Sequence, residues 1–327
     1  MMHVRALSGL DAANYKRSIL HSDECDWLEK NCFVDIWIEL IHALRLEPRA
    51  LLAFVVAIDF EGDQWTFFKP PHDELRALYG IDVQELNVWR PLLEHALEHV
   101  APGKLISTEA DAFWLPDTQG TDYRSRHTKT TIVIEDVDAH AGTLGYFHNA
   151  GYFRLQGDDF ANLFRVGVPE NPTFMPLFAE LVRTDRLVRL PERELAESSF
   201  ELLRAHSGRR PIENPVGRFA IRFSRDFPEL QQRGLAHYHA WAFATLRQLG
   251  AAFELASIHL GWLAPHTTPE LARAAERFRA ISSTTKTLLL KVARAVHTGK
   301  PLDTVATFAE LSRLWDEGME LLDGAFA

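Results

Sequence analysis

The chain has 327 residues, of which 46% are hydrophobic and 24% are charged, so it is long enough for two domains and has an ordinary globular composition. A formal net charge of -10 argues against general nucleic-acid binding, which needs a basic surface. Its only two cysteines, Cys25 and Cys32, exclude a disulfide scaffold and fit a reducing compartment. No apolar run is long enough to span a membrane and the first residues lack a secretory signal, so we expect a cytoplasmic protein.

The segment from Glu29 to Leu40 predicts an amphipathic helix that begins at a cysteine. Asn31 is a good N-cap residue, and apolar residues recur at helical spacing after Cys32. Backbone N–H groups at a helix start carry partial positive charge, which favours a thiolate and can hold an oxyanion beside it. The alternative is a buried cysteine that packs as a small hydrophobic side chain.

The rest of the first half predicts mixed helix and strand. Residues 51–60 indicate a buried strand, and a turn at Gly62 leads to a second strand at 65–68. Helical patterning follows at 72–79 and 88–100, and then a run of strands at 105–108, 111–115, 128–134, 144–148 and 152–155. This order predicts an α+β domain with a mainly antiparallel sheet, which we assign to residues 1–168.

The second half is predicted to be helical. Asp158 and Asp159 begin a short helix, and prolines at positions 169, 172 and 176 mark a connection. Long helix-forming stretches cover 230–263 and 269–297, and a shorter one covers 304–322. We therefore expect a helical bundle over residues 169–327, acting as a lid or a docking surface.

A cysteine nucleophile needs a base, and the base needs a third group that orients it. His127 stands directly before the strand at 128–134, while His148 and Asn149 end the strand at 144–148. If these strands form a hairpin, either His148 or Asn149 lies beside His127. The alternatives are a surface histidine, since the chain has 15, and a plain turn role for Asn149. His95 and His99 have a metal-ligand spacing, but no third ligand is indicated and we expect no metal.

Several segments resemble the bacterial family catalogued as domain of unknown function 1839. They are residues 31–40, 62–71, 145–152, 214–219 and 242–248, and the resemblance extends over nearly the whole chain. The family name carries no activity.

A shorter pattern, residues 111–116 followed by His127 at a strand start, resembles the N-terminal domain of the butirosin biosynthesis protein H family. The resemblance implies a papain-like core, with Cys32 as nucleophile and His127 as base. Its third catalytic residue would be Asn149, which we favour slightly, or His148. Asn31 and Asp111 lie in the matching segments and are assigned to substrate binding.

The same resemblance implies an acyltransferase without a bound cofactor of its own. It would move an acyl or aminoacyl group from the phosphopantetheine thioester of an acyl or peptidyl carrier protein to a small amine acceptor, with no nucleic-acid or membrane partner. Arg124, Arg126 and Lys129 flank His127 and would meet the acidic carrier, unless they are ordinary solvated charges. Gln64 and Trp65 would shape the acyl pocket, although a core role for the tryptophan is the alternative. A cysteine hydrolase (amidase, thioesterase or peptidase) and a non-catalytic binding protein remain the competing hypotheses.

Overall fold

A computed structural model describes residues 3–169, 175 and 177–327, and its contacts divide the chain into two compact units. The sheet unit comprises Met1–His21, Cys32–Pro48 and His72–Arg189, and the helical unit comprises Ser22–Asn31, Arg49–Pro71 and Leu190–Ala327. Each unit is therefore built from separate stretches of sequence. The expected domain boundary after residue 168 stays a prediction, and Pro172 and Pro176 lie outside the described residues.

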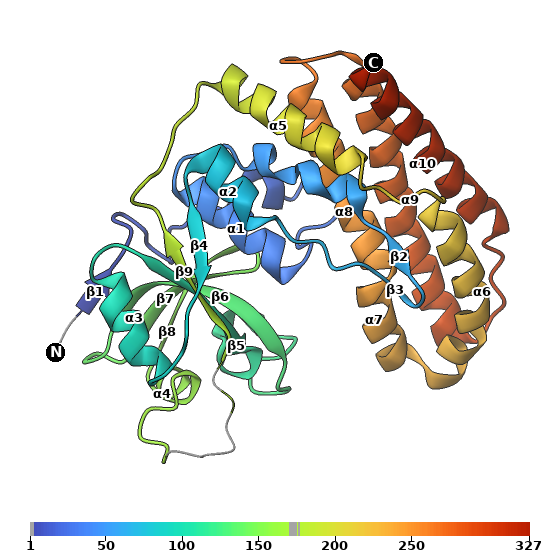
Figure 1. Cartoon of the computed structure of the whole chain (residues 1–327). Helices are drawn as coiled ribbons and strands as arrows, with labels where there is room; N and C mark the ends of the chain where they lie inside the picture. Colours follow the sequence, from blue (N-terminus) through green and yellow to red (C-terminus); the bar gives the residue numbers. More distant parts are fainter. Residues whose placement is uncertain (1–2, 170–174, 176) are drawn as a thin grey trace. The chain divides into compact units, whose positions relative to one another are not determined.

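The sheet unit contains one antiparallel sheet (Figure 1). Its strands are β1 (His3–Arg5), β4 (Asp82–Glu85), β5 (Leu105–Asp111), β6 (Lys129–Asp138), β7 (Thr143–His148), β8 (Gly151–Gln156) and β9 (Ala179–Arg183). Their order is β4-β9-β5-β6-β7-β8, and β1 pairs with the far end of β6, beyond the stretch that pairs with β5. The predicted α+β class with a mainly antiparallel sheet is confirmed.

The two faces of the sheet are covered by different helices. Ile132, Ile134 and Tyr146 share a core with residues of α3 (Leu92–Val100) and α4 (Asp158–Leu163). On the other face, α1 (Cys32–Ala43) packs against β6, β7 and β8. Because side chains alternate along a strand, Lys129, Thr131 and Val133 of β6 point toward α1. This alternation decides which candidate residues can share a site.

A bulge in β6 breaks the alternation at Glu135. Val133 is opposite Phe147, and the next regular pair on this side is Asp136 with Gly145. Ile134 and Val137, on either side of the bulge, therefore both face α3. Glu135 and Asp136 between them are both buried on the α1 side.

Several short elements differ from the sequence prediction. The apolar run at 51–60, predicted as a strand, lies mostly in the 3-10 helix η2 (Pro48–Ala57), followed by the short hairpin of β2 (Phe60–Glu61) and β3 (Gln64–Trp65). The two strands predicted at 105–108 and 111–115 are the single strand β5, followed by the 3-10 helices η3 (Ala112–Trp114) and η4 (Pro116–Thr118). The helix at 72–79 is confirmed as α2 (His72–Tyr79). A further 3-10 turn, η1 (Ile19–His21), precedes α1.

The helical unit confirms the helical second half. Its helices are α5 (Glu192–Ser207), α6 (Pro215–Arg233), α7 (Leu235–Ala244), α8 (Leu246–Leu263), α9 (Glu270–Thr298) and α10 (Val305–Phe326), with α9 packed against both α8 and α10. The stretch predicted as continuous over 230–263 is interrupted at Gly234, whose φ of +79° suits glycine, and again at Thr245. Among the described residues, no helix combines the length and the apolar character required to span a bilayer.

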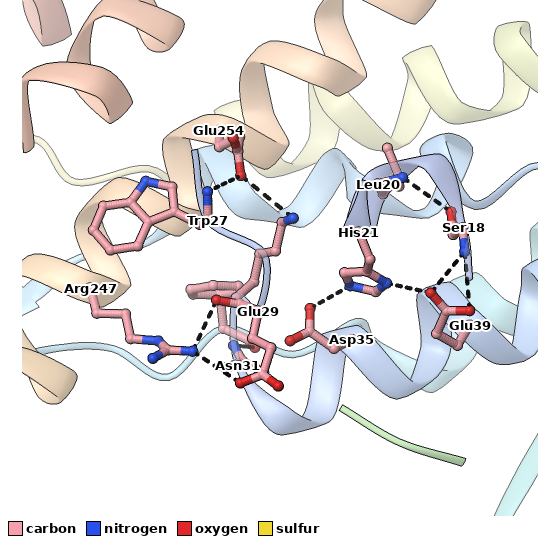
Figure 2. A network of polar contacts seen from close by, with 12 residues as sticks. Ser18, Leu20, His21, Trp27, Glu29, Asn31, Asp35, Glu39, Arg247 and Glu254 are labelled. Atoms are coloured by element: carbon pink, nitrogen blue, oxygen red, sulfur yellow. Dashed lines mark hydrogen bonds and ion pairs between the residues drawn. The ribbon is translucent and has the colours of Figure 1, made fainter. Parts of the chain in front are cut away.

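The segment Ser22–Asn31 is held within the helical unit by α8 and α9. Glu254 of α8 accepts hydrogen bonds from the backbone N–H groups of Asp26 (2.6 Å) and Trp27 (3.3 Å), and it lies 3.5 Å from the buried Lys30 ammonium (Figure 2). The Trp27 indole donates to the Ser282 hydroxyl of α9 at 3.0 Å. Burial raises the pKa of Glu254, and the neighbouring lysine opposes that rise.

Candidate active site in the sheet unit

Cys32 is the first residue of α1, as the sequence predicted. Its side chain is half-buried. The charge of Cys32 interacts with that of Lys129, the first residue of β6. The pKa of Lys129 is raised first by its hydrogen bond to Glu109 and further by the charge of Cys32. This coupling is mutual, so the ammonium favours negative charge on the sulfur.

His127 stands two residues before Lys129 and is bonded to a carboxylate. Its Nδ1 atom lies 2.6 Å from Oδ2 of Asp111, and its ring stacks on Phe113 with the ring centroids 4.3 Å apart. The other oxygen of Asp111 accepts the backbone N–H of Phe113 at 3.1 Å, which fixes the orientation of the carboxylate. A carboxylate only accepts hydrogen bonds, so Nδ1 carries the proton and Nε2 is left as the basic nitrogen.

The strand pairing places these groups on the α1 side of the sheet. Asp111 is opposite Lys129 in the β5–β6 ladder, and the backbone N–H of Ala112 extends the pairing by donating to the carbonyl of Thr128 at 2.9 Å. Positions 127 and 129 are two apart on an extended chain, so their side chains share a face and their Cα atoms are roughly 7 Å apart. The structure thus places the acid–imidazole pair at the end of β6 that carries Lys129, the residue whose pKa the charge of Cys32 raises.

His148 and Asn149, the predicted orienting residues, lie elsewhere. The ring of His148 is 1% exposed and bridges Asp117 (2.5 Å) and Thr130 (2.8 Å), and Thr130 belongs to the face of β6 that is turned away from α1. Asn149 occupies the tight β7–β8 turn with a φ of +44°. The position beside His127 is occupied by Asp111, which the sequence analysis assigned to substrate binding instead.

The three cations predicted to meet an acidic partner are all paired with acids. Arg126 bonds Asp122 at 2.8 Å and Lys129 bonds Glu109 at 2.9 Å. The guanidinium of Arg124 bonds Asp159 at 2.5 Å and lies 4.6 Å from the centre of the Trp114 ring. Surface pairs of this kind leave little net charge around the imidazole.

The remaining predicted binding residues belong to the helical unit. Trp65 is 1% exposed and packs against Phe60 and Phe219, with ring centroids 5.6 Å and 6.0 Å away, which is the core role that the sequence left open. Gln64 is exposed on the β2–β3 hairpin. The side-chain amide of Asn31 is buried and donates to the carbonyl of Phe68 at 3.0 Å.

The helix that carries Cys32 is fixed in the sheet unit by a buried charge network (Figure 2). The ring of His21 is fully buried between two carboxylates of α1, with Nδ1 bonded to Glu39 and Nε2 3.0 Å from Asp35. Glu39 also accepts the Tyr15 hydroxyl (2.6 Å) and the backbone N–H of Ser18 (3.0 Å). Burial by itself raises the pKa of Glu39, but these donors, first among them His21, outweigh it and the pKa is lowered.

Two models of one known protein family match the chain. Residues 16–184 match the model of the DUF1839 N-terminal domain, and residues 192–324 match that of the DUF1839 C-terminal domain. The chain belongs to the DUF1839 family. The search of curated proteins found no match.

Sequence reasoning missed two features of this DUF1839 protein. The orienting role of Asp111 was hidden because β5 and β6 are joined by the long segment from 112 to 128, so their register is not a local property. The electrostatic interaction of Lys129 with Cys32 depends on how α1 lies on the sheet. The alternation of polar and apolar residues from Lys129 to Val133 was the one available signal. Extended back along the strand, it places His127 on the same face as Lys129.

Proposed function

We propose that this DUF1839 protein is a cysteine-dependent acyltransferase with a papain-like core. Cys32 is the nucleophile, His127 is the general base and acid, and Asp111 holds the imidazole in its active tautomer. The acyl or aminoacyl donor is a phosphopantetheine thioester on a carrier protein, and the acceptor is a small amine.

One observation carries the proposal: Nδ1 of His127 lies 2.6 Å from Oδ2 of Asp111. His127 stands two residues before Lys129, whose pKa the charge of Cys32 raises. An exposed surface histidine has no need of a fixed acid partner, whereas a catalytic base does. The placement of the cysteine at a helix start and of the histidine at a strand start supports the same assignment.

The groups present can perform both half-reactions. His127 Nε2 takes the proton of the Cys32 thiol, and the sulfur attacks the thioester carbonyl while backbone N–H groups at the start of α1 face the developing oxyanion. Collapse of this intermediate breaks the bond to the carrier thiol, which leaves with the proton from the imidazolium. An amine then attacks the acyl-enzyme, gives its proton to His127, and releases an amide and the free thiol.

Hydrolysis of the same acyl-enzyme is the second candidate function, and one observation favours it. The His127 side chain is 69% exposed, so water has access to the base. The acid–base pairing of Arg124, Arg126 and Lys129 also leaves carrier docking to be supported by the sequence resemblance alone.

The first experiment exposes the full-length protein to an acyl-phosphopantetheine thioester, free and on a carrier protein, and measures its intact mass. We expect one acyl adduct, mapped by peptide mass spectrometry to Cys32 and absent from Cys32→Ala. Cys25→Ala is the matched control, since it removes the other half-buried thiol and should acylate normally. Lack of an adduct together with lack of any released acid or amide would refute both acyl transfer and thioester hydrolysis and favour the non-catalytic binding role.

The fate of the adduct separates the two enzyme classes. Discharge that accelerates in proportion to added amine, with an amide as product, identifies a transferase. Discharge at an unchanged rate, with a free acid as product, identifies a hydrolase and refutes the transfer step.

A further inference from the structure

A row of four paired residues crosses the sheet at the end of β6 that lies away from Lys129. Arg5 of β1 is opposite Asp136, Asp136 is opposite Gly145, and Gly145 is opposite Arg154 of β8. Directly opposed residues project from the same face of a sheet. The two arginines therefore flank the Asp136–Gly145 pair, and Arg154 reaches the buried carboxylate across the glycine. The β6 bulge creates the row, because it turns Asp136 to the α1 side.

Gly145 leaves the space that another residue would fill. A Cβ atom at this position would lie 2.2 Å from the Tyr152 hydroxyl and 2.9 Å from Cβ of Asp136. The phenol instead crosses the glycine and donates to Oε2 of Glu135 at 2.6 Å. Burial raises the pKa of this glutamate.

The two arginines of the row line a cavity of about 260 Å³. Its polar lining comes from Arg5, Tyr152 and Arg154, and from Asp11 in the loop after β1. Pockets for drug-sized ligands measure roughly 300–1,000 Å³, so this one suits a smaller molecule.

The cavity carries charges of both signs, from Arg5 and Arg154 and from Asp11. Asp136, 1% exposed, bonds Arg5 and lies 3.6 Å from Arg154, so two guanidiniums share one carboxylate, which also accepts a contact from the His3 ring at 2.7 Å. Asp11 is exposed at the rim. The pKa of Asp11 is lowered mainly by its bond to Asn14 and the N–H of Ala13, with further contributions from the charges of both arginines.

We propose that this cavity binds a small zwitterion of the size of a free α-amino acid, whose carboxylate meets Arg5 and Arg154 and whose ammonium group meets Asp11. Guanidinium groups match a carboxylate with their paired donors. Arg5 already meets Asp136 and lies 4.0 Å from Glu135, whereas the Arg154 side chain is 46% exposed and can turn its donors toward a ligand. The Tyr152 side chain is part of the cavity lining.

This site is separate from the proposed catalytic residues and does not depend on them. Asp136 and Lys129 are seven positions apart on β6, which corresponds to about 23 Å along an extended strand. Failure of acyl transfer would therefore leave the proposal intact, and the reverse also holds.

The test is calorimetric titration of the full-length protein with each proteinogenic L-amino acid in turn. The best binder is then compared with its two halves, the acid without the α-amino group and the amine without the carboxylate. We expect saturable binding of the amino acid and at least tenfold weaker binding of either half, because each loses a charge-assisted contact.

Two variants and two matched controls complete the test. Asp11→Asn and Arg154→Gln should each weaken binding about tenfold without loss of the folded state, because both side chains are exposed at least in part. Asp185→Asn and Arg193→Gln remove comparable exposed charges elsewhere and should bind as the wild type does. The proposal is overturned if no amino acid binds at millimolar concentration, if the deaminated acid binds equally well, or if Asp11→Asn has no effect.

Discussion

Replacing Glu39 by glutamine tests the buried network that holds α1. The carboxylate is completely buried and accepts hydrogen bonds from the ring of His21, the hydroxyl of Tyr15 and the backbone N–H of Ser18. Glu39→Gln keeps the shape of the side chain but removes its charge and turns one acceptor oxygen into a donor. At least one of the three donors then faces an N–H₂ group.

The expected cost follows from the burial of the charges. Removing one partner of a buried ion pair typically lowers the free energy of unfolding by about 3–5 kcal/mol. The free energy of unfolding of a whole domain is only roughly 5–15 kcal/mol. The cost depends on pH, because the folded pKa of Glu39 lies below its usual 4.5. A depressed pKa contributes stability that is present above pH 4.5 and is lost as the pH falls through the folded pKa. The difference in the free energy of unfolding between wild type and variant should therefore be constant near neutrality and become smaller below pH 4.5.

The appropriate assay reports on α1 itself, since the two units can unfold separately. We suggest hydrogen exchange of the peptide that covers Cys32–Ala43, read by mass spectrometry across a urea titration at several pH values. Glu85→Gln, an exposed position on β4 of the same unit, is the matched control and should change stability by less than about 0.5 kcal/mol. The role assigned to Glu39 is refuted if Glu39→Gln lowers the free energy of unfolding no more than this control does. It is also refuted if the loss is as large below pH 4.5 as at neutral pH.

Three further predictions concern other sites. Asp111→Asn should slow acylation of the nucleophilic thiol about a hundredfold in single-turnover kinetics while leaving the melting temperature unchanged, because the neighbouring imidazole loses its fixed tautomer. Lys30→Met should lower the melting temperature more at pH 7.5 than at pH 5.5, since Glu254, whose pKa burial already raises, is then left without its buried cation and is stabilised by protonation. Gly145→Ala should destabilise the sheet unit by about 1–3 kcal/mol in urea unfolding, and less so in a Tyr152→Phe background, where the clashing hydroxyl is absent.

The elements that sequence reasoning located are those whose signal is local. The helix start at Cys32 was visible in the cap and the apolar spacing, and the hairpin expected from the strands at 128–134 and 144–148 is formed by β6 and β7. The short strands β1, β4 and β9 carried no such signal. They are strands because they pair with partners far away in sequence, as β9 does with both β4 and β5.

The run at 51–60 shows a different limit. Residues 50–56 are all buried, so their side chains carry no polar–apolar alternation from which a period can be read. A short apolar run of this kind fits a buried strand and a buried helix equally well. The fold resolves it as the 3-10 helix η2, in which the carbonyl of Ala50 accepts the Ser199 hydroxyl at 2.7 Å.

The same limit explains why the candidate site was only half predicted. Cys32 and His127 were each placed by a local signal, a helix start and a strand start. Their third partner depended on which strand lies beside β6 at its first residue, and the hairpin rule selected β7, whereas the ladder places Asp111 of β5 there.

The helix that carries Cys32 also shows why an amphipathic pattern does not by itself predict exposure. Asp35 and Glu39 lie one turn apart and mark the polar side of α1, yet every residue from Phe33 to Ile41 is buried. The burial is tolerated because the ring of His21 bonds one carboxylate with each of its nitrogens. A helix enclosed on all sides cannot tilt without breaking that network, so the position of its first residue is fixed by charges one and two turns away. The thiol at the start of α1 is thereby held on a rigid element, which the proposed catalysis by Cys32, His127 and Asp111 requires.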